Sequence, residues 1–368
     1  MRRSYLLNAP ALLAILFLSL FAVSCKKNPQ VNPNPTITEP VNYAKLGLYE
    51  QISGVNRRIF IACSKLGTQS TVNYGLVFDT GSTGLTIDAT DIIPASMITT
   101  NGFVISGDSV VVNGITITSQ QAVITYGSVN SNISEYGNLA YATVTVGDGN
   151  GNITTPRIPI FLYYKILDNN NKQLSAHAAD VFGVGPGVSS TSRKIGSPLS
   201  YFKLADNVAN GFRLAKLNTS NFGNSATYTP NLLTIGLTPN DLNASGFTMH
   251  ALTYSAISGY SANIASTINY NGQSIPGVIL FDTGTPSTHI IENQAATSNT
   301  AALPAGTAVG IITSQGFGYN YSTSNTYNFT TVQKPSYSGD NRTIFSINFF
   351  IDNEFLIDYT NHRIGLKQ

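Results

Sequence analysis

From about Val41 onward, the chain alternates short apolar runs with pairs of turn-forming residues such as Asn-Gly, Gly-Asp and Pro-Asn. Runs of this length, rich in Val, Ile, Tyr and Thr, are typical of β-strands, and the polar pairs between them are typical of turns. The pattern therefore predicts an all-β protein. The clearest runs cover residues 59–62, 76–78, 109–117, 122–126, 142–146 and 158–164, and then 232–235, 264–270, 278–281, 309–312, 344–351 and 355–359.

Signals for helices are few and short. Ser197 followed by Pro198 is a typical helix start, because Ser caps free backbone amides and Pro suits the first helical position. We expect a helix over 197–205, and another turn or two over 292–296. No sequence period of about 20–50 residues is apparent, which argues against a solenoid.

The N-terminal segment indicates where the protein is sent. Arg2 and Arg3 precede an apolar run over 11–23, which is short for a membrane span and suits the core of a signal peptide. The run ends in small residues before Cys25, a pattern that resembles the lipobox of bacterial lipoproteins. We expect a signal peptide over 1–24, lipidation of Cys25 and a flexible tether over 25–41, which together anchor the protein in the bacterial cell envelope, at the outer membrane, facing the periplasm or the surface. An ordinary signal peptide with an incidental cysteine is the alternative.

Composition excludes several functions. Only 10% of residues are charged and the formal net charge is +2, so we expect no nucleic-acid partner. The four histidines have no zinc-site spacing with one another or with Cys63, so we expect no metal. Because Cys25 and Cys63 are the only cysteines, lipidation of Cys25 excludes an intrachain disulfide and leaves Cys63 as a core residue. No Gly-x-Ser-x-Gly motif is present, which argues against a serine hydrolase.

One motif occurs twice, once in each half of the chain. Asp79 and Asp282 each follow an apolar run and precede Thr-Gly and a hydroxyl residue. Each acid therefore lies at the end of a buried strand, just before a glycine turn. The duplication predicts two similar lobes, which we place at residues 42–210 and 211–368.

The residues beside the acids suggest how the two act together. If the lobes pack about a pseudo-twofold axis, the acids meet, and two carboxylates that close share one proton. One then acts as a base on a trapped water while the other protonates the substrate carbonyl. The threonines are expected to tie the two loops together, the glycines to permit the turns and the hydroxyls to orient the carboxyls. These supporting residues are Thr80, Gly81 and Ser82 in the first motif, and Thr283, Gly284 and Thr285 in the second.

Both motifs lie in a longer series of segments with a recognisable order. Together with residues 124–127, 136–147, 179–185, 231–236 and 355–366, they resemble the pepsin-type aspartic peptidases of family A1 over nearly all the chain after the tether. The resemblance implies a bilobal all-β fold with an interlobe cleft, and a flap over that cleft carrying Tyr126 and Gly127. It implies a monomeric aspartic endopeptidase with an extended polypeptide substrate, acid-favoured activity and no cofactor or metal. In this family the two aspartates are known to share one proton.

The chain departs from the family pattern at several positions. Thr86 stands where an aromatic residue commonly supports the flap tyrosine, and Ser346 stands where a glycine completes the second acid loop. The loop after Tyr126 is long, so Tyr136 is the alternative flap residue. These departures leave open a catalytically inactive peptide- or protein-binding lipoprotein on the same scaffold, and, more remotely, a structural envelope protein with incidental acids. Other acids are interpreted as loop or cap residues: Asp88, Asp91 and Asp180.

Overall fold

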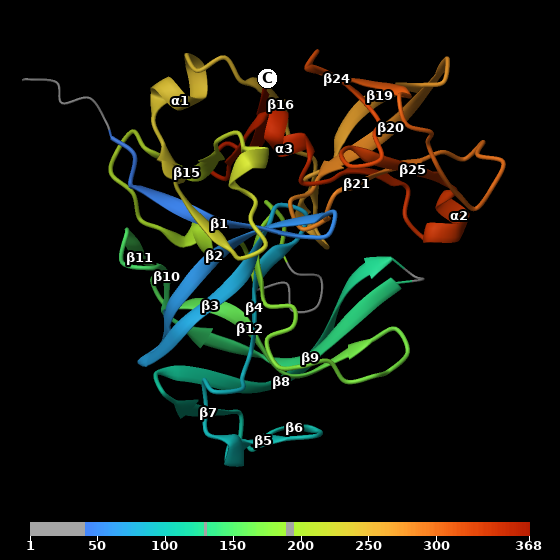
Figure 1. Ribbon diagram of the computed structural model, residues 1–368. Coiled ribbons are helices and arrows are strands. Elements are labelled where there is room, and N and C mark those ends of the chain that lie inside the picture. The colour runs from blue at the N-terminus through green and yellow to red at the C-terminus, as the bar shows by residue number, and fades with distance from the viewer. Residues whose placement is uncertain (1–40, 129–130, 189–194) are drawn as a thin grey trace, which may run out of the picture. The chain divides into compact units, whose positions relative to one another are not determined.

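The computed structural model describes residues 41–128, 131–188 and 195–368. The predicted signal peptide, Cys25 and all but the last residue of the tether lie outside these residues. The described chain is mostly strand, arranged in two large sheets of 16 and 8 strands with two small two-stranded sheets (Figure 1). This confirms the predicted all-β class.

The 16-stranded sheet contains most of the first half of the chain together with strands from the second. Its central strands run in the order β15-β1-β2-β3-β13-β4-β12-β9-β8. Strand β1 pairs antiparallel with β15, so a strand from the start of the chain joins the second half directly. The strands of the first half are β1 (Ala44–Ser53), β2 (Asn56–Leu66), β3 (Gln69–Asp79), β4 (Thr83–Asp88), β5 (Ile98–Thr99), β6 (Gly102–Phe103), β7 (Ser109–Val112), β8 (Ile115–Ser128), β9 (Ser131–Ala142), β10 (Val144–Gly147), β11 (Asn152–Thr154), β12 (Ile158–Asp168) and β13 (Val181–Val184).

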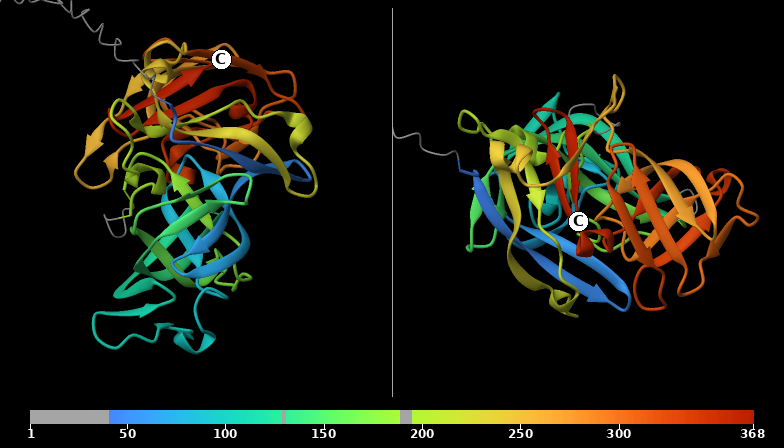
Figure 2. Two further views of the ribbon diagram at one scale, coloured as in Figure 1. Left: turned by 90° about the vertical axis from the view of Figure 1, so that its left-hand side faces the viewer. Right: turned by 90° about the horizontal axis from the view of Figure 1, so that it is seen from above.

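The 8-stranded sheet belongs wholly to the second half, in the order β22-β25-β21-β26-β20-β19-β23-β24. Figure 1 shows it in orange and red, and Figure 2 shows it from two further sides. The strands of the second half are β14 (Ala209–Leu214), β15 (Thr227–Leu237), β16 (Thr248–Ala251), β17 (Tyr254–Ser255), β18 (Gly259–Tyr260), β19 (Ile264–Tyr270), β20 (Gln273–Phe281), β21 (Thr288–Glu292), β22 (Thr300–Ala302), β23 (Ala308–Thr313), β24 (Gly318–Ser322), β25 (Phe329–Gln333), β26 (Arg342–Phe345), β27 (Glu354–Asp358) and β28 (Arg363–Lys367).

The helices of the described chain are all short. They are the α-helices α1 (Pro239–Asn243), α2 (Pro335–Ser338) and α3 (Phe349–Asp352), and the 3₁₀-helices η1 (Ala95–Met97), η2 (Pro198–Tyr201) and η3 (Thr219–Asn221). None of them is long and apolar enough to cross a membrane.

Each acid motif follows a strand that has a parallel neighbour. Strand β3 pairs in parallel with β13, placing Phe78 beside Phe182, and β20 pairs in parallel with β26, placing Phe281 beside Phe345. All four phenylalanines are buried. Burial of these rings fixes the ends of both acid strands, because core side chains pack closely and permit little displacement. The repeat of this arrangement is the structural counterpart of the repeated motif.

Several predicted elements differ in detail. The run 109–117 is two strands rather than one, because Asn113 and Gly114 both have positive φ (51° and 71°), as a type I′ hairpin turn requires. The run 344–351 is the end of strand β26 followed by α3. A short apolar run alone does not distinguish a buried strand from a buried helix. The helix expected over 197–205 is the shorter η2, and residues 292–296 form the end of β21 and a turn. The lobe boundary stays a prediction; residues 210 and 211 lie within β14.

Candidate active site

The two motif acids lie together at the ends of their strands. Asp79 is the last residue of β3 and Asp282 directly follows β20. Their carboxyl groups are within hydrogen-bonding contact of each other. A β-carbon built on Gly81 would lie 2.5 Å from Asp282 Oδ1, and one built on Gly284 would lie 2.6 Å from Asp79 Oδ2. Each carboxyl therefore packs against the glycine of the opposite motif, a position that no other residue type could occupy without displacing it.

The two threonines join the loops by reciprocal hydrogen bonds. The Thr80 amide donates to Thr283 Oγ1 and the Thr283 amide donates to Thr80 Oγ1, both at 3.0 Å. Each hydroxyl in turn donates to a carbonyl of the opposite strand, Thr80 to Phe281 at 2.8 Å and Thr283 to Phe78 at 2.6 Å. Both side chains are fully buried, so these bonds are shielded from water and hold the acid loops in register.

Backbone amides and hydroxyls orient each carboxyl in the same way. The Gly81 amide donates to Asp79 Oδ1 and the Gly284 amide to Asp282 Oδ1, both at 2.7 Å. On the outer oxygens, the hydroxyls of Ser82 and Thr285 donate to Asp79 Oδ2 and Asp282 Oδ2, both at 2.6 Å. Each carboxyl is therefore held through both of its oxygens by its own loop.

Asp79 is buried and lies beside a second carboxyl, so its ionised form is costly. Desolvation, and then the charge of Asp282, raise the pKa of Asp79, while the hydrogen bonds from Ser82 and the Gly81 amide oppose the rise. Two coupled acids titrate as a pair, so the pair keeps one proton well above the pH at which a free carboxyl loses it. An arrangement of this kind can supply an acid and a base at once.

The acids lie on the wall of a cleft of about 1310 Å³. Its lining includes residues of β2, β3, β4, β8, β9 and β13 of the larger sheet and of β20, β21, β25 and β26 of the smaller one. This volume suits a ligand larger than a typical small molecule, whose pockets are about 300–1,000 Å³.

Tyr126 and Gly127 lie in β8 and line this cleft. The Tyr126 hydroxyl donates to Thr86 Oγ1 at 3.3 Å. The alternative flap residue, Tyr136, lies in β9 opposite Val123, and Lys165 Nζ lies 4.3 Å from the centre of its ring. Tyr136 does not line the cleft, so the structure places Tyr126 and not Tyr136 beside the acids.

Sequence reasoning missed two buried groups near the flap. Glu135 of β9 is fully buried, and its Oε1 accepts a hydrogen bond from Thr86 Oγ1 at 3.4 Å. Glu135 is the one charged residue of β9, in a chain with only 10% charged residues. That isolation is a signal that could have marked it as a functional candidate. Asp180, interpreted as a loop or cap acid, does lie in the loop before β13, but its burial was not predicted. It is buried and accepts hydrogen bonds from the Tyr163 hydroxyl at 2.6 Å and the Asp88 amide at 2.9 Å, and it pairs with His177 at 2.7 Å.

The Ser346 departure is accommodated within the lobe. The Ser346 amide donates to His289 Nδ1 at 3.0 Å, and its hydroxyl lies 3.3 Å from the same nitrogen. His289 is fully buried, and burial lowers its pKa to about 3, so its ring is neutral and can accept this bond. The residue that replaces glycine therefore gains a buried partner. The Asp282 amide still bonds the Phe345 carbonyl at 2.8 Å.

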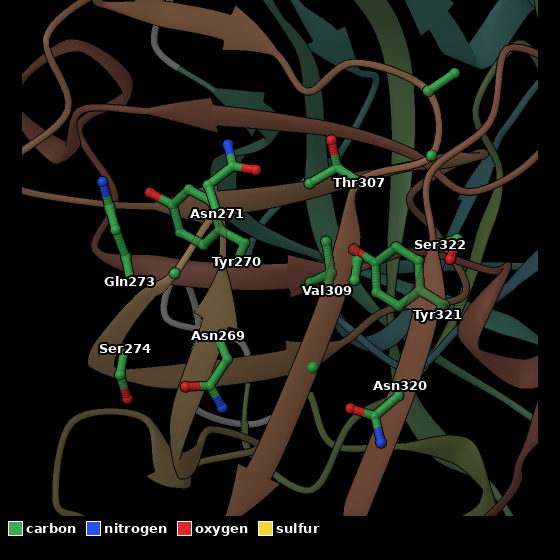
Figure 3. A pocket seen from close by; sticks show the side chains of 15 residues that line it. Asn269, Tyr270, Asn271, Gln273, Ser274, Thr307, Val309, Asn320, Tyr321 and Ser322 are labelled. Carbon is green, nitrogen blue, oxygen red and sulfur yellow. The ribbon is translucent and has the colours of Figure 1, made fainter.

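A second hollow lies on the smaller sheet (Figure 3). It measures about 960 Å³ and lies between the β19–β20 turn and strands β23 and β24, with amide side chains such as Asn269, Asn271 and Asn320 around it. The described residues that line it carry no charge, so it lacks the acid pair. The described chain also holds no group of His, Cys, Asp and Glu residues placed to bind a metal ion.

Comparison with solved structures identifies the architecture. The crystal structure of an aspartic proteinase from Irpex lacteus aligns with a TM-score of 0.54 at 19% identity, covering 88% of this chain and 97% of that one. The crystal structure of Basic 7S globulin from soybean aligns with a TM-score of 0.54 at 13% identity, covering 89% and 96%. The chain has the bilobal pepsin-like fold. No known family profile and no curated protein matches the sequence.

Proposed function

We propose that this protein is an aspartic endopeptidase. The observation that carries the proposal is the pair of adjacent carboxyls, the buried Asp79 and the half-buried Asp282, held by matching hydrogen bonds in a large cleft of a pepsin-like fold. The fold alone does not carry it, because the same architecture occurs in a protein named as a globulin rather than a proteinase.

The chemistry follows from the shared proton. A water held between the two carboxyls loses a proton to the ionised one and attacks the peptide carbonyl. The protonated carboxyl donates to the carbonyl oxygen, so the tetrahedral intermediate forms without a separate strong base. Collapse of this intermediate returns a proton to the leaving amine and breaks the C–N bond. The substrate is expected to lie extended across the cleft beneath Tyr126, where its backbone can pair with neighbouring strands.

Cleavage assays test the proposal. The full-length chain, purified in mild detergent, is incubated with an unfolded protein at pH 3–7, with and without pepstatin. Cleavage that pepstatin stops, and that Asp79→Asn and Asp282→Asn each reduce by about 10²–10⁴-fold, supports the enzyme. Asp206→Asn changes the same chemical group at an exposed site outside the cleft and serves as the control. Tight peptide binding without cleavage at any pH would instead favour the binding module.

The same proposal includes where the protein acts. We propose that Cys25 carries a lipid that holds a monomeric enzyme on the bacterial cell envelope, with polypeptides as its partners. Metabolic labelling with a fatty-acid analogue tests this point. Label that is lost in Cys25→Ser supports the anchor, and an unlabelled, freely released wild-type chain contradicts it.

A further inference from the structure

An arginine lies in the cleft beside the acids. Arg58 in β2 lines the cleft together with Phe60 of the same strand and Val77 of β3. Residues two apart in a strand face the same side, and Phe60 pairs directly opposite Val77. Arg58 and Phe60 therefore form one continuous surface with the strand that ends in Asp79. The intervening Ile59 is directed into the core.

Arg58 forms no ion pair with any described residue. Its Nη1 donates to the backbone carbonyl of Gly284, which is a neutral acceptor. The other cleft arginine, Arg342, differs in this respect. Its guanidinium contacts both oxygens of Asp340, with Nη2 to Oδ2 at 2.6 Å and Nε to Oδ1 at 2.9 Å. Arg58 is thus the cleft cation whose charge the described protein leaves unpaired.

Arg58 is also partly dehydrated. Burial lowers the pKa of its guanidinium, and the charges of Asp79 and Asp282 oppose that shift. A guanidinium stays protonated under all working conditions, so it cannot relieve this cost by losing its proton. The acid pair keeps one proton and therefore carries about one negative charge. Because neither acid forms an ion pair with Arg58, this charge offsets the cost of burying the guanidinium only in part. An anionic group that enters the cleft and contacts the guanidinium directly would complete the compensation.

We infer that Arg58 forms a subsite for an acidic side chain of the substrate, so that the cleft favours polypeptides with Asp or Glu close to the cleaved bond. The inference rests on the proposed function for its substrate. The planar guanidinium can bind a carboxylate through two parallel hydrogen bonds. Phe60 and Val77 add an apolar contact for the stem of the same side chain or for its neighbour.

The other charged groups of the cleft sharpen the preference. Glu292 in β21 and Asp340 before β26 are acids on the smaller sheet, and Arg342, the cation of that wall, is already paired with Asp340. Glu292 Oε1 accepts a bond from Gln333 Nε2 at 2.7 Å, and burial raises its pKa. A substrate acid therefore finds an unpaired cation at β2 and none on the wall formed by β21 and β26.

The experiment maps where the enzyme cuts. The full-length chain digests a peptide mixture from unfolded proteins at pH 5.5, and mass spectrometry records the residues around each cleaved bond. We expect Asp and Glu to be enriched at one fixed position. Two synthetic peptides that differ only by Glu or Gln at that position should then differ in kcat/KM by about tenfold or more, the size of a charge-assisted hydrogen bond. The ratio should fall toward one near pH 3, where the substrate Glu is protonated.

Variants assign the preference to one residue. Arg58→Gln should bring the Glu-to-Gln ratio close to one, and Arg58→Lys should retain part of it. Arg157→Gln removes the same charge from an exposed residue outside the cleft, so it should leave the ratio unchanged. Cleavage with no acidic preference would overturn the inference while leaving the peptidase intact. A preference that survives Arg58→Gln and disappears in Arg342→Gln would also overturn it.

Binding measurements keep the inference testable without catalysis. Fluorescence anisotropy uses labelled peptides that carry Glu or Gln at each position in turn, so it applies to the wild-type chain even if that chain cleaves nothing. Tighter binding of the Glu peptide that depends on Arg58 supports the subsite and shows that only the proposed chemistry has failed. Equal binding of the two peptides at pH 5.5 contradicts the subsite.

Discussion

The Tyr126 hydroxyl bonds to Thr86 Oγ1 at 3.3 Å, across 40 residues of sequence. Thr86 occupies the position where the sequence lacks the aromatic residue that commonly supports a flap tyrosine. The Thr86 hydroxyl in turn donates a hydrogen bond to the buried carboxyl of Glu135 at 3.4 Å. Hydrogen bonds therefore connect Tyr126 at the cleft, through Thr86, to Glu135 inside the lobe. In this chain the flap tyrosine is supported by these bonds and not by an aromatic side chain.

The first prediction concerns this support. Thr86→Val keeps the side-chain shape and removes the hydroxyl that receives the Tyr126 bond. The loss of one neutral hydrogen bond, about 1 kcal/mol, should lower kcat/KM about fivefold, and Thr86→Ser should retain most of the activity. Steady-state kinetics on one peptide substrate measures both variants. Equal kinetics for Thr86→Val and the wild type would show that Tyr126 does not depend on Thr86.

The second prediction concerns Glu135. Burial raises the pKa of its carboxyl well above its usual range, despite the opposing bond from Thr86. The folded chain therefore keeps a proton that the unfolded chain releases above about pH 4.3. The stability contributed by this proton is complete below that pH and falls as pH rises toward the folded pKa. Glu135→Gln cannot ionise, so the Tm of the wild type should decline relative to this variant between about pH 4.5 and 7.

Thermal melts of the two proteins at matched pH values check the difference. The neighbouring groups Asp88, Asp180 and His177 are present in both proteins, so they cancel in the comparison. A Tm difference that stays constant over this range would show that Glu135 is ionised in the folded chain or that its titration is not linked to folding.

The third prediction concerns the pH profile of activity. Catalysis needs one proton on the acid pair, and burial together with Asp282 raises the pKa of Asp79. The singly protonated pair should therefore persist from acid pH toward neutrality, and kcat/KM should fall on the alkaline side as the last proton leaves. A profile measured from pH 3 to 9 tests this. Full activity at alkaline pH, with none near pH 4–5, would exclude the mechanism.

The acid loops could be predicted from the sequence because the residues that shape each loop are adjacent in the chain. A strand end, a Gly turn and a flanking hydroxyl are adjacent in the chain, so Asp79, Gly81 and Ser82 can be read as one unit. Arg58 and Glu135 were missed because their environment is assembled from distant segments. Arg58 contacts Gly284, and Glu135 contacts Thr86. No pattern near either residue distinguishes a cleft or a buried network from an ordinary exposed strand position.

The burial of Asp180 was not predicted for the same reason. Its neighbours in sequence suggest a turn, and the residues that bury it come from β4 and β12. The predicted strand boundaries were wrong where a short apolar run could form either a strand or a helix. Residues 344–351 contain both a strand and a helical turn, and only the packing of Phe349 and Phe350 into the core decides between them.

The fourth prediction tests the close approach of the two motifs. Gly81→Ala places a β-carbon about where the Asp282 carboxyl lies, 2.5 Å from its Oδ1. One of the two must move, and a displacement of this size in a catalytic group should cost about 10²-fold or more in kcat. Gly75→Ala, in the strand β3 that leads into this loop, meets its first neighbour only at 3.6 Å and should be tolerated. Equal activity of the two variants would mean that the acids are not as close as described.

The fifth prediction concerns the second departure from the family pattern. Ser346→Gly restores the usual residue, and a simple comparison of sequences would expect it to improve the site. In this chain it removes a hydroxyl that lies beside His289 and receives a bond from the Asn348 amide at 3.4 Å. It also adds backbone freedom to the unfolded state. We therefore expect Ser346→Gly to lower the free energy of unfolding by about 1 kcal/mol without raising kcat. Denaturant titration and steady-state kinetics measure the two quantities, and a faster, equally stable variant would show that Ser346 impairs the acid loop.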